Sequence, residues 1–158
     1  MHITFSTIFS AAAAMATIAC AAGSGSPMSH GAAVAKLNAN DITIASSGGC
    51  TDRNNPKCTS LEGVLSGTVD TVISLKGDSG CSSLVITGGT ETGHGDDFDK
   101  THWKGYKLDV RHVPCLDNYI HNAFEFAFVR SDGACCWKAG DSGNLYCDEG
   151  SHWDVVFN

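Results

Sequence analysis

Hydrophobic residues recur with near-helical spacing in two parts of the chain. The first set predicts a helix that Thr59 or Ser60 caps and Gly77 ends, with apolar positions at Leu61, Val64, Leu65, Val69, Val72, Ile73 and Leu75. The second pattern begins at Leu116 and extends to about Phe124. Residues 125–129 either end this second helix or begin a strand.

Short apolar runs bounded by glycine and polar residues predict strands between and after these helices. The runs cover residues 41–44, 82–87, 106–110, 145–147 and 153–157. Residues 46–57 and 90–101 are typical of loops, and residues 133–144 of a glycine-rich loop or hairpin turn. The order of elements favours an α+β fold, in which a small, largely antiparallel sheet has helices packed on one side.

The 158 residues are enough for one compact domain, but the first residues of the chain are not expected to belong to that domain. Residues 3–22 are small and apolar with no Lys, Arg, Asp or Glu, so residues 1–22 are interpreted as a signal peptide. Residues 23–40 are rich in Gly, Ser and Ala, which predicts a linker or propeptide. The domain is expected over residues 41–158, in a secreted, extracellular protein.

The cysteine content agrees with export. Of eight cysteines, Cys20 lies in the predicted signal peptide, and an odd number remains after it. This count predicts up to three disulfides and one free thiol. The expected bridges join Cys50 to Cys58, Cys81 to Cys115, and Cys147 to either Cys135 or Cys136.

The formal charge of −7 limits the partners that the domain can bind. Phosphate backbones require a basic face, so an acidic exported domain is a poor candidate for nucleic-acid binding. No membrane contact is expected after removal of the signal peptide, and a monomer is expected.

Two short patterns carry the candidate chemistry. His102, Gly105 and Asp109 form H-x-x-G-x-x-x-D, and Glu149 and His152 form E-x-x-H. Two imidazoles and one carboxylate can hold zinc and leave one coordination position open, which is typical of catalytic rather than structural zinc sites. A second carboxylate, Glu149, can take a proton from water in that position.

The spacing within each pattern requires a bend. Strand residues an odd number apart point to opposite faces, so His102 and Asp109 need a turn between them in order to converge. Gly105 can supply this turn, and Gly150 can do the same between Glu149 and His152. The patterns therefore predict a loop ligand followed by a strand ligand, and a turn carboxylate followed by His152 at the start of the last strand.

These motifs resemble the zinc metallopeptidases that include D-Ala-D-Ala carboxypeptidases, D-Ala-D-Ala dipeptidases and L-Ala-D-Glu endopeptidases. Their signature is S-x-H-x-x-G-x-A-x-D followed by E-x-x-H; here Lys100 replaces the Ser and Lys107 the Ala. Residues 90–102 also resemble the metal-binding region of the Hedgehog signalling domain, which shares that fold. The resemblance implies that His102, Asp109 and His152 hold Zn²⁺ and that Glu149 is the general base. It further implies a peptidase acting on the peptides of bacterial peptidoglycan.

One departure from the family changes the expected specificity. Glu91 stands in a region where family members commonly carry an Arg. A carboxypeptidase needs a cation for the free carboxylate of its substrate, so an endopeptidase is expected unless Lys104, Lys107 or Arg111 supplies that charge. The alternative is a non-enzymatic, metal-stabilised extracellular binding domain of Hedgehog-like fold. His94 fits a role beside the metal and an exposed loop position equally well.

Overall fold

The computed structural model describes residues 24–95, 99–140 and 142–158, so the predicted signal peptide lies outside the described residues. One mixed sheet runs through the described part of the chain, in the order β1-β2-β3-β7-β6-β5-β4. Its strands are β1 (Ile42–Ile44), β2 (Leu84–Gly88), β3 (Lys107–Arg111), β4 (Glu125–Val129), β5 (Cys135–Lys138), β6 (Leu145–Asp148) and β7 (His152–Val156). The helices are α1 (His30–Asn38), α2 (Ser66–Asp78) and α3 (Pro114–Ala123).

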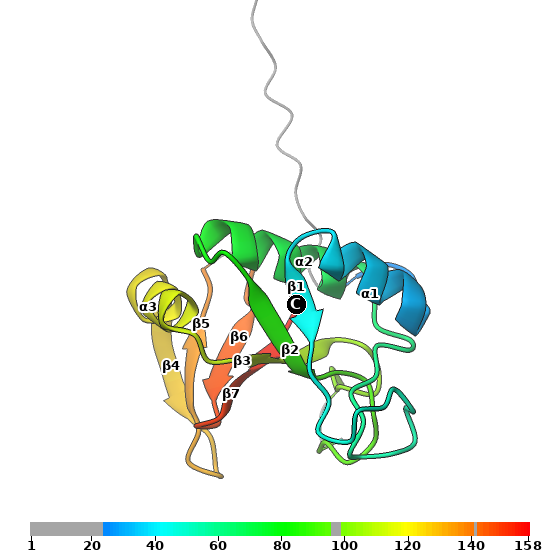
Figure 1. The fold of residues 1–158 in the computed structure, drawn as a ribbon. Coiled ribbons are helices and arrows are strands. Elements are labelled where there is room, and N and C mark those ends of the chain that lie inside the picture. Colours follow the sequence, from blue (N-terminus) through cyan, green and yellow to red (C-terminus); the bar gives the residue numbers. More distant parts are fainter. Residues whose placement is uncertain (1–23, 96–98, 141) are drawn as a thin grey trace, which may run out of the picture.

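The strand pairing confirms the predicted α+β class. β1 and β2 are parallel, and every other neighbouring pair is antiparallel. The sheet has seven strands in the described residues and is larger than the small sheet expected from the sequence. Figure 1 shows α1 and α2 side by side along the sheet, with α3 beside β4 and β5.

Alternation along β3 and β7 separates the core from the candidate site. Leu108 and Val110 on β3, and Trp153 and Val155 on β7, are buried in the core cluster that the helices also enter. Residues between them in sequence point to the opposite face. That face carries Lys107, Asp109, His152 and Asp154, and Asp109 lies directly across from Asp154 in the register of the two strands.

The first predicted helix begins later than expected. α2 starts at Ser66 after the extended residue Leu65, although the apolar spacing begins at Leu61. Gly63 has a φ of 83°, which interrupts a helix there, and Leu61 and Val64 reach the core from a turn. Leu61 and Val64 therefore continue the helical spacing of apolar residues although they are buried from a turn that precedes α2.

Two other segments differ from the sequence prediction. Residues 133–144 contain the strand β5, because the disulfide between Cys136 and Cys147 and a regular ladder tie this segment to β6. Within the predicted linker or propeptide, residues 30–38 form α1, whose Ala33 and Leu37 are fully buried in the core. This part of the segment therefore packs with the domain. Residues 125–129, which the sequence left open, form the edge strand β4.

The predicted disulfide framework is confirmed. The bridges join Cys50 to Cys58, Cys81 to Cys115, and Cys136 to Cys147, and Cys135 is the free thiol among the cysteines of residues 24–158 that the structure describes. Intramolecular disulfides of this kind are typical of extracellular proteins. None of the helices in the described ranges combines the length and the apolar character needed to cross a membrane.

Candidate metal centre

The central carboxylate of the site is Asp109, on the sheet face that lies away from the core. It stands across from Gly88 of β2 and Asp154 of β7. An ideal Cβ on residue 88 would lie only 2.1 Å from Asp109 Oδ2, so the absence of a side chain at Gly88 provides the room for this carboxylate. β2, β3 and β7 together fix its position.

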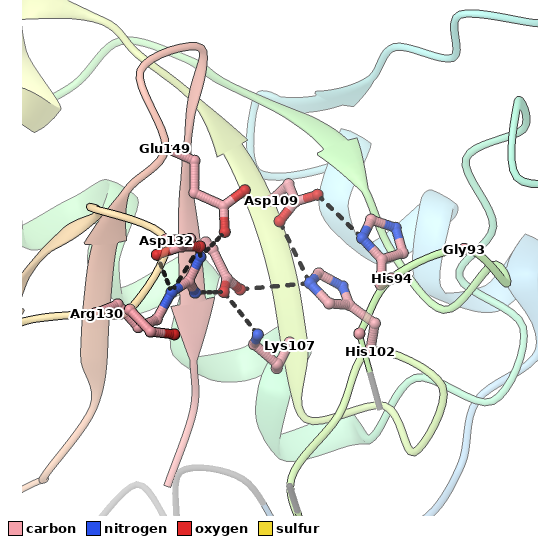
Figure 2. Close-up of a pocket in the computed structure, with 11 residues that line it drawn as sticks. Gly93, His94, His102, Lys107, Asp109, Arg130, Asp132 and Glu149 are labelled. Carbon is pink, nitrogen blue, oxygen red and sulfur yellow. Dashed lines mark hydrogen bonds and ion pairs between the residues drawn. The ribbon is translucent and has the colours of Figure 1, made fainter. Parts of the chain in front are cut away.

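His102 reaches Asp109 through the predicted glycine turn. Gly105 has a φ of 82°, and its N–H donates to the carbonyl of His102. His102 Nε2 then lies 3.3 Å from Asp109 Oδ1 and 3.3 Å from Asp154 Oδ1. Figure 2 shows the imidazole pointing into the cavity toward Asp109.

The hydrogen bonds of His102 determine what its free nitrogen can do. Nδ1 lies 2.8 Å from the carbonyl oxygen of Gly89, which can only accept, so Nδ1 carries a proton. In the neutral ring, Nε2 is therefore an unprotonated nitrogen that faces two carboxylate oxygens. Such an arrangement requires a positive charge between the groups, either a second proton on His102 or a metal ion.

The protonation equilibria reflect the same electrostatics. Burial lowers the pKa of His102, but Asp109 and Asp154 outweigh it and raise the pKa to about 9. Burial raises the pKa values of both carboxyls, yet the charges and hydrogen bonds around them hold each pKa below its ordinary value. Both carboxylates are therefore ionised at neutral pH, although Asp109 is 5% exposed and Asp154 only 3%.

The second motif approaches Asp109 from the other side. Glu149 follows β6 and His152 begins β7, as predicted, with Gly150 at a φ of 80° between them. His152 Nε2 lies 3.5 Å from Asp109 Oδ1 and 3.2 Å from Glu149 Oε2. The four candidate site residues, His102, Asp109, Glu149 and His152, are thus linked through Asp109 and His152.

The tightest potential ligand group includes a residue whose role the sequence left open. His94, His102 and Asp109 offer ligand atoms that all lie within 4.8 Å of one another, and this is the only such group of three in the described part of the chain. His152 touches the group through Asp109 but does not belong to it. The rings of His94 and His102 stack with centroids 3.9 Å apart, and His94 Nδ1 lies 3.7 Å from Asp109 Oδ2.

Glu91 holds His94 in this position. Its buried carboxylate accepts hydrogen bonds from the backbone N–H groups of Ser60, at 2.7 Å, and Gly89, and its Oε1 lies 3.1 Å from His94 Nε2. Burial raises the pKa of Glu91, but these hydrogen bonds outweigh it and hold the pKa below its ordinary value of 4.5. The ionised carboxylate fixes the proton of His94 on Nε2 and leaves Nδ1 directed at Asp109.

Arg130 and Lys107 bring positive charge to the cavity, where both are paired with acidic side chains. Arg130, just after β4, pairs with Asp132 and Glu149 and donates to Asp154 Oδ2 at 2.8 Å. Lys107 Nζ donates to the same oxygen at 2.6 Å. In Figure 2 these groups gather on the side of the cavity opposite His94 and His102. Lys107 is one of the cations that the sequence suggested for the substrate's charge, whereas the motifs gave no sign of Arg130, because a hairpin distant from both of them carries it.

The cavity has a volume of about 470 Å³ and is open to solvent. Its lining includes His94, His102, Asp109, Glu149 and Asp154, while His152 lies beside it. Metal–ligand distances of about 2.0–2.1 Å place neighbouring ligands of a tetrahedral ion about 3.3 Å apart. The separations of 3.3 and 3.5 Å around Asp109 Oδ1 match that spacing for each imidazole in turn, whereas the group that lies close enough together to hold a cation is His94, His102 and Asp109.

Comparison of the chain with models of protein families, with curated proteins and with solved structures finds no match.

Proposed function

We propose that this chain is a secreted zinc-dependent peptidase that hydrolyses peptide bonds of bacterial peptidoglycan. The observation that carries the proposal is the environment of His102 Nε2. This nitrogen faces two buried carboxylates within an open cavity that also holds Glu149. A cation at that point, with a basic carboxylate beside it, is the arrangement that metal-assisted hydrolysis requires.

His102, Asp109 and His152 would hold the zinc. When bound, zinc would polarise the scissile carbonyl and lower the pKa of a coordinated water to about 7. Glu149 would accept the proton of the attacking water at Oε2 and return it to the leaving amine. Arg130 pairs with the other oxygen, Oε1, and so directs Oε2 toward His152 and the cavity.

The shape of the cavity supports an endopeptidase. A neighbouring cavity of about 580 Å³ shares Lys107, Arg130 and Asp154 with the first and continues past Phe128 and Val156. Together the two cavities offer room for substrate on both sides of a scissile bond. Peptidoglycan as the substrate class follows from the resemblance of the two motifs, and the three disulfides support export.

The alternative is a metal-stabilised extracellular binding domain without catalytic activity. The pairing of Glu149 with Arg130 favours it, because a carboxylate oxygen that is held by a guanidinium is not free to bind the attacking water. The two functions share the metal but differ in what they require of Glu149.

The replacement Glu149→Gln separates the two functions. Zinc-loaded wild type and variant are incubated with purified peptidoglycan, with and without chelator, and the soluble products are identified by mass spectrometry. The peptidase predicts a loss of about 10²–10⁴-fold in rate for the variant, with unchanged zinc content and thermal unfolding. Glu125→Gln, which changes an exposed carboxylate on β4, is the matched control and should retain full activity. Stoichiometric zinc in wild type without release of any peptide would overturn the peptidase and leave the binding domain.

A further inference from the structure

We propose that Asp154 is a ligand of the metal, so that the cation lies between two carboxylates rather than beside one. This inference rests on the metal site of the proposed function but not on hydrolysis. Asp154 is 3% exposed, and its Oδ1 is the one buried side-chain polar atom in the described residues that lacks a hydrogen-bond partner. A buried carboxylate oxygen without a donor is costly unless a cation compensates it.

The other oxygen of Asp154 explains why Oδ1 is left without a donor. Lys107 and Arg130 both donate to Oδ2, at 2.6 and 2.8 Å. Two cations on one oxygen fix the rotation of the carboxylate and direct Oδ1 at His102 Nε2, 3.3 Å away. This distance qualifies as an ion pair, but the contact does not have the geometry of a hydrogen bond.

Asp154 Oδ1 lies at ligand spacing from His102 Nε2, but Asp154 is not in the group whose ligand atoms all lie within 4.8 Å of one another, so the two carboxylates would have to close on the ion. Asp154 faces Asp109 across the β3–β7 ladder, and the Oδ1 atoms of both residues are 3.3 Å from the same nitrogen of His102. That value equals the spacing of about 3.3 Å between neighbouring ligands of a tetrahedral ion. His152 precedes Asp154 by two residues on the same strand, so β7 offers both side chains to the metal from one face. With His102 and Asp109 they would make four protein ligands, so water would enter as a fifth ligand, a coordination number that zinc adopts during catalysis.

A second carboxylate would change which metals the site accepts. Two carboxylates neutralise a divalent cation, and oxygen ligands suit Mn²⁺ better than imidazoles do. Removing one of them should therefore weaken Mn²⁺ binding more than Zn²⁺ binding.

The test compares metal affinity in Asp154→Asn and Asp132→Asn, with a chromophoric chelator as competitor for Zn²⁺ and then Mn²⁺. Asp132 is the matched control because it also lines the cavity and pairs with Arg130, but it is half exposed and does not face His102. We expect Asp154→Asn to bind Zn²⁺ at least 10–100-fold more weakly, and Asp132→Asn to stay within about threefold of wild type. The visible spectrum of the Co²⁺-loaded protein should change only in Asp154→Asn.

Wild-type affinity and an unchanged Co²⁺ spectrum in Asp154→Asn would overturn the inference, whatever Glu149→Gln does to hydrolysis. Weaker binding in a protein that cleaves nothing would support Asp154 as a ligand and refute the peptidase alone. If Asp154→Asn does not fold, a crystal structure of zinc-loaded wild type decides the question. Asp154 Oδ1 within about 2.2 Å of the ion supports the proposal, and a separation beyond about 3 Å refutes it.

Discussion

The replacement Gly88→Ala tests whether the position of Asp109 controls metal binding. An added Cβ would lie 2.1 Å from Asp109 Oδ2 and 2.8 Å from its Cγ. Close contacts between carbon and oxygen are about 3.3 Å or longer, so the carboxylate or strand β2 must move by more than about 1 Å. The backbone of Gly88 does not have a positive φ, so the effect comes from the contact and not from a forbidden conformation.

The size of the effect follows from the tolerance of metal sites. Ligand distances in such sites vary by about 0.2 Å, and a shift of 1 Å removes Asp109 from coordination. Weakening of a supporting contact alone costs about 10–100-fold in metal affinity, so displacement of a ligand should cost at least that much. Crowding of this part of the sheet should also lower the free energy of unfolding by about 1–3 kcal/mol.

The assay is competition for Zn²⁺ against a chromophoric chelator, together with urea unfolding of the metal-free protein. Gly77→Ala is the control, because no atom outside its own helix lies within 4 Å of the added Cβ. Alanine at this position in α2 should leave metal affinity unchanged and stabilise the fold by about 0.5–1 kcal/mol. Wild-type zinc affinity in Gly88→Ala would show that Asp109 does not bind the metal from the position described here.

Three further predictions concern the disulfides, acid stability and the free thiol. Replacing Cys81 and Cys115 by Ala opens a loop with a sequence separation of 34 and should lower the unfolding free energy by about 4 kcal/mol in urea melts; a loss below 1 kcal/mol would contradict this. Because the pKa of Glu91 is below 4.5, its ionised form stabilises the fold fully above that pH, and this stability is lost as the pH falls through the lower folded-state pKa. Glu91→Gln should therefore cost about 1–3 kcal/mol at pH 7 and flatten the acid decline seen in unfolding curves, whereas a parallel pH profile would refute the role of this carboxylate. In the denatured, unreduced chain without residues 1–22, a thiol reagent should label Cys135 alone, and three labelled thiols would show that a bridge is missing.

The sequence predicted those parts of the fold that depend on residues close together along the chain. Alternation identified β3 and β7, and the count and spacing of the cysteines predicted the bridges, including the two alternatives for Cys147. The start of α2 was wrong, because Leu61 is buried from a turn that Gly63 makes, and burial alone cannot distinguish a turn from a helix. α1 was missed because its small residues show little periodicity, although Leu37 packs fully into the core.

The candidate site shows the same division between local and long-range information. Each motif contains the glycine that turns one residue toward the other, so the sequence could predict that His102 approaches Asp109 and that Glu149 precedes the strand of His152. The role of these residues as metal ligands stays a prediction. His94 lies in the same loop as Glu91, but its position depends on backbone N–H groups of a distant segment, which no spacing reveals.

The sequence did not predict that Asp154 and Arg130 lie in the candidate site, for two different reasons. The position of Asp154 on the strand could have been predicted, because a residue two positions after His152 shares the same face of the strand. The sequence does not give the register of β3 and β7, which places Asp154 opposite Asp109. For Arg130 there was no comparable signal, because its hairpin reaches the site only through the twist and order of the whole sheet. A motif identifies the ligands that are close to one another along the chain. The side chains that balance the charge of those ligands come from strands that are neighbours only in the folded sheet, and these decide whether the cation meets one carboxylate or two.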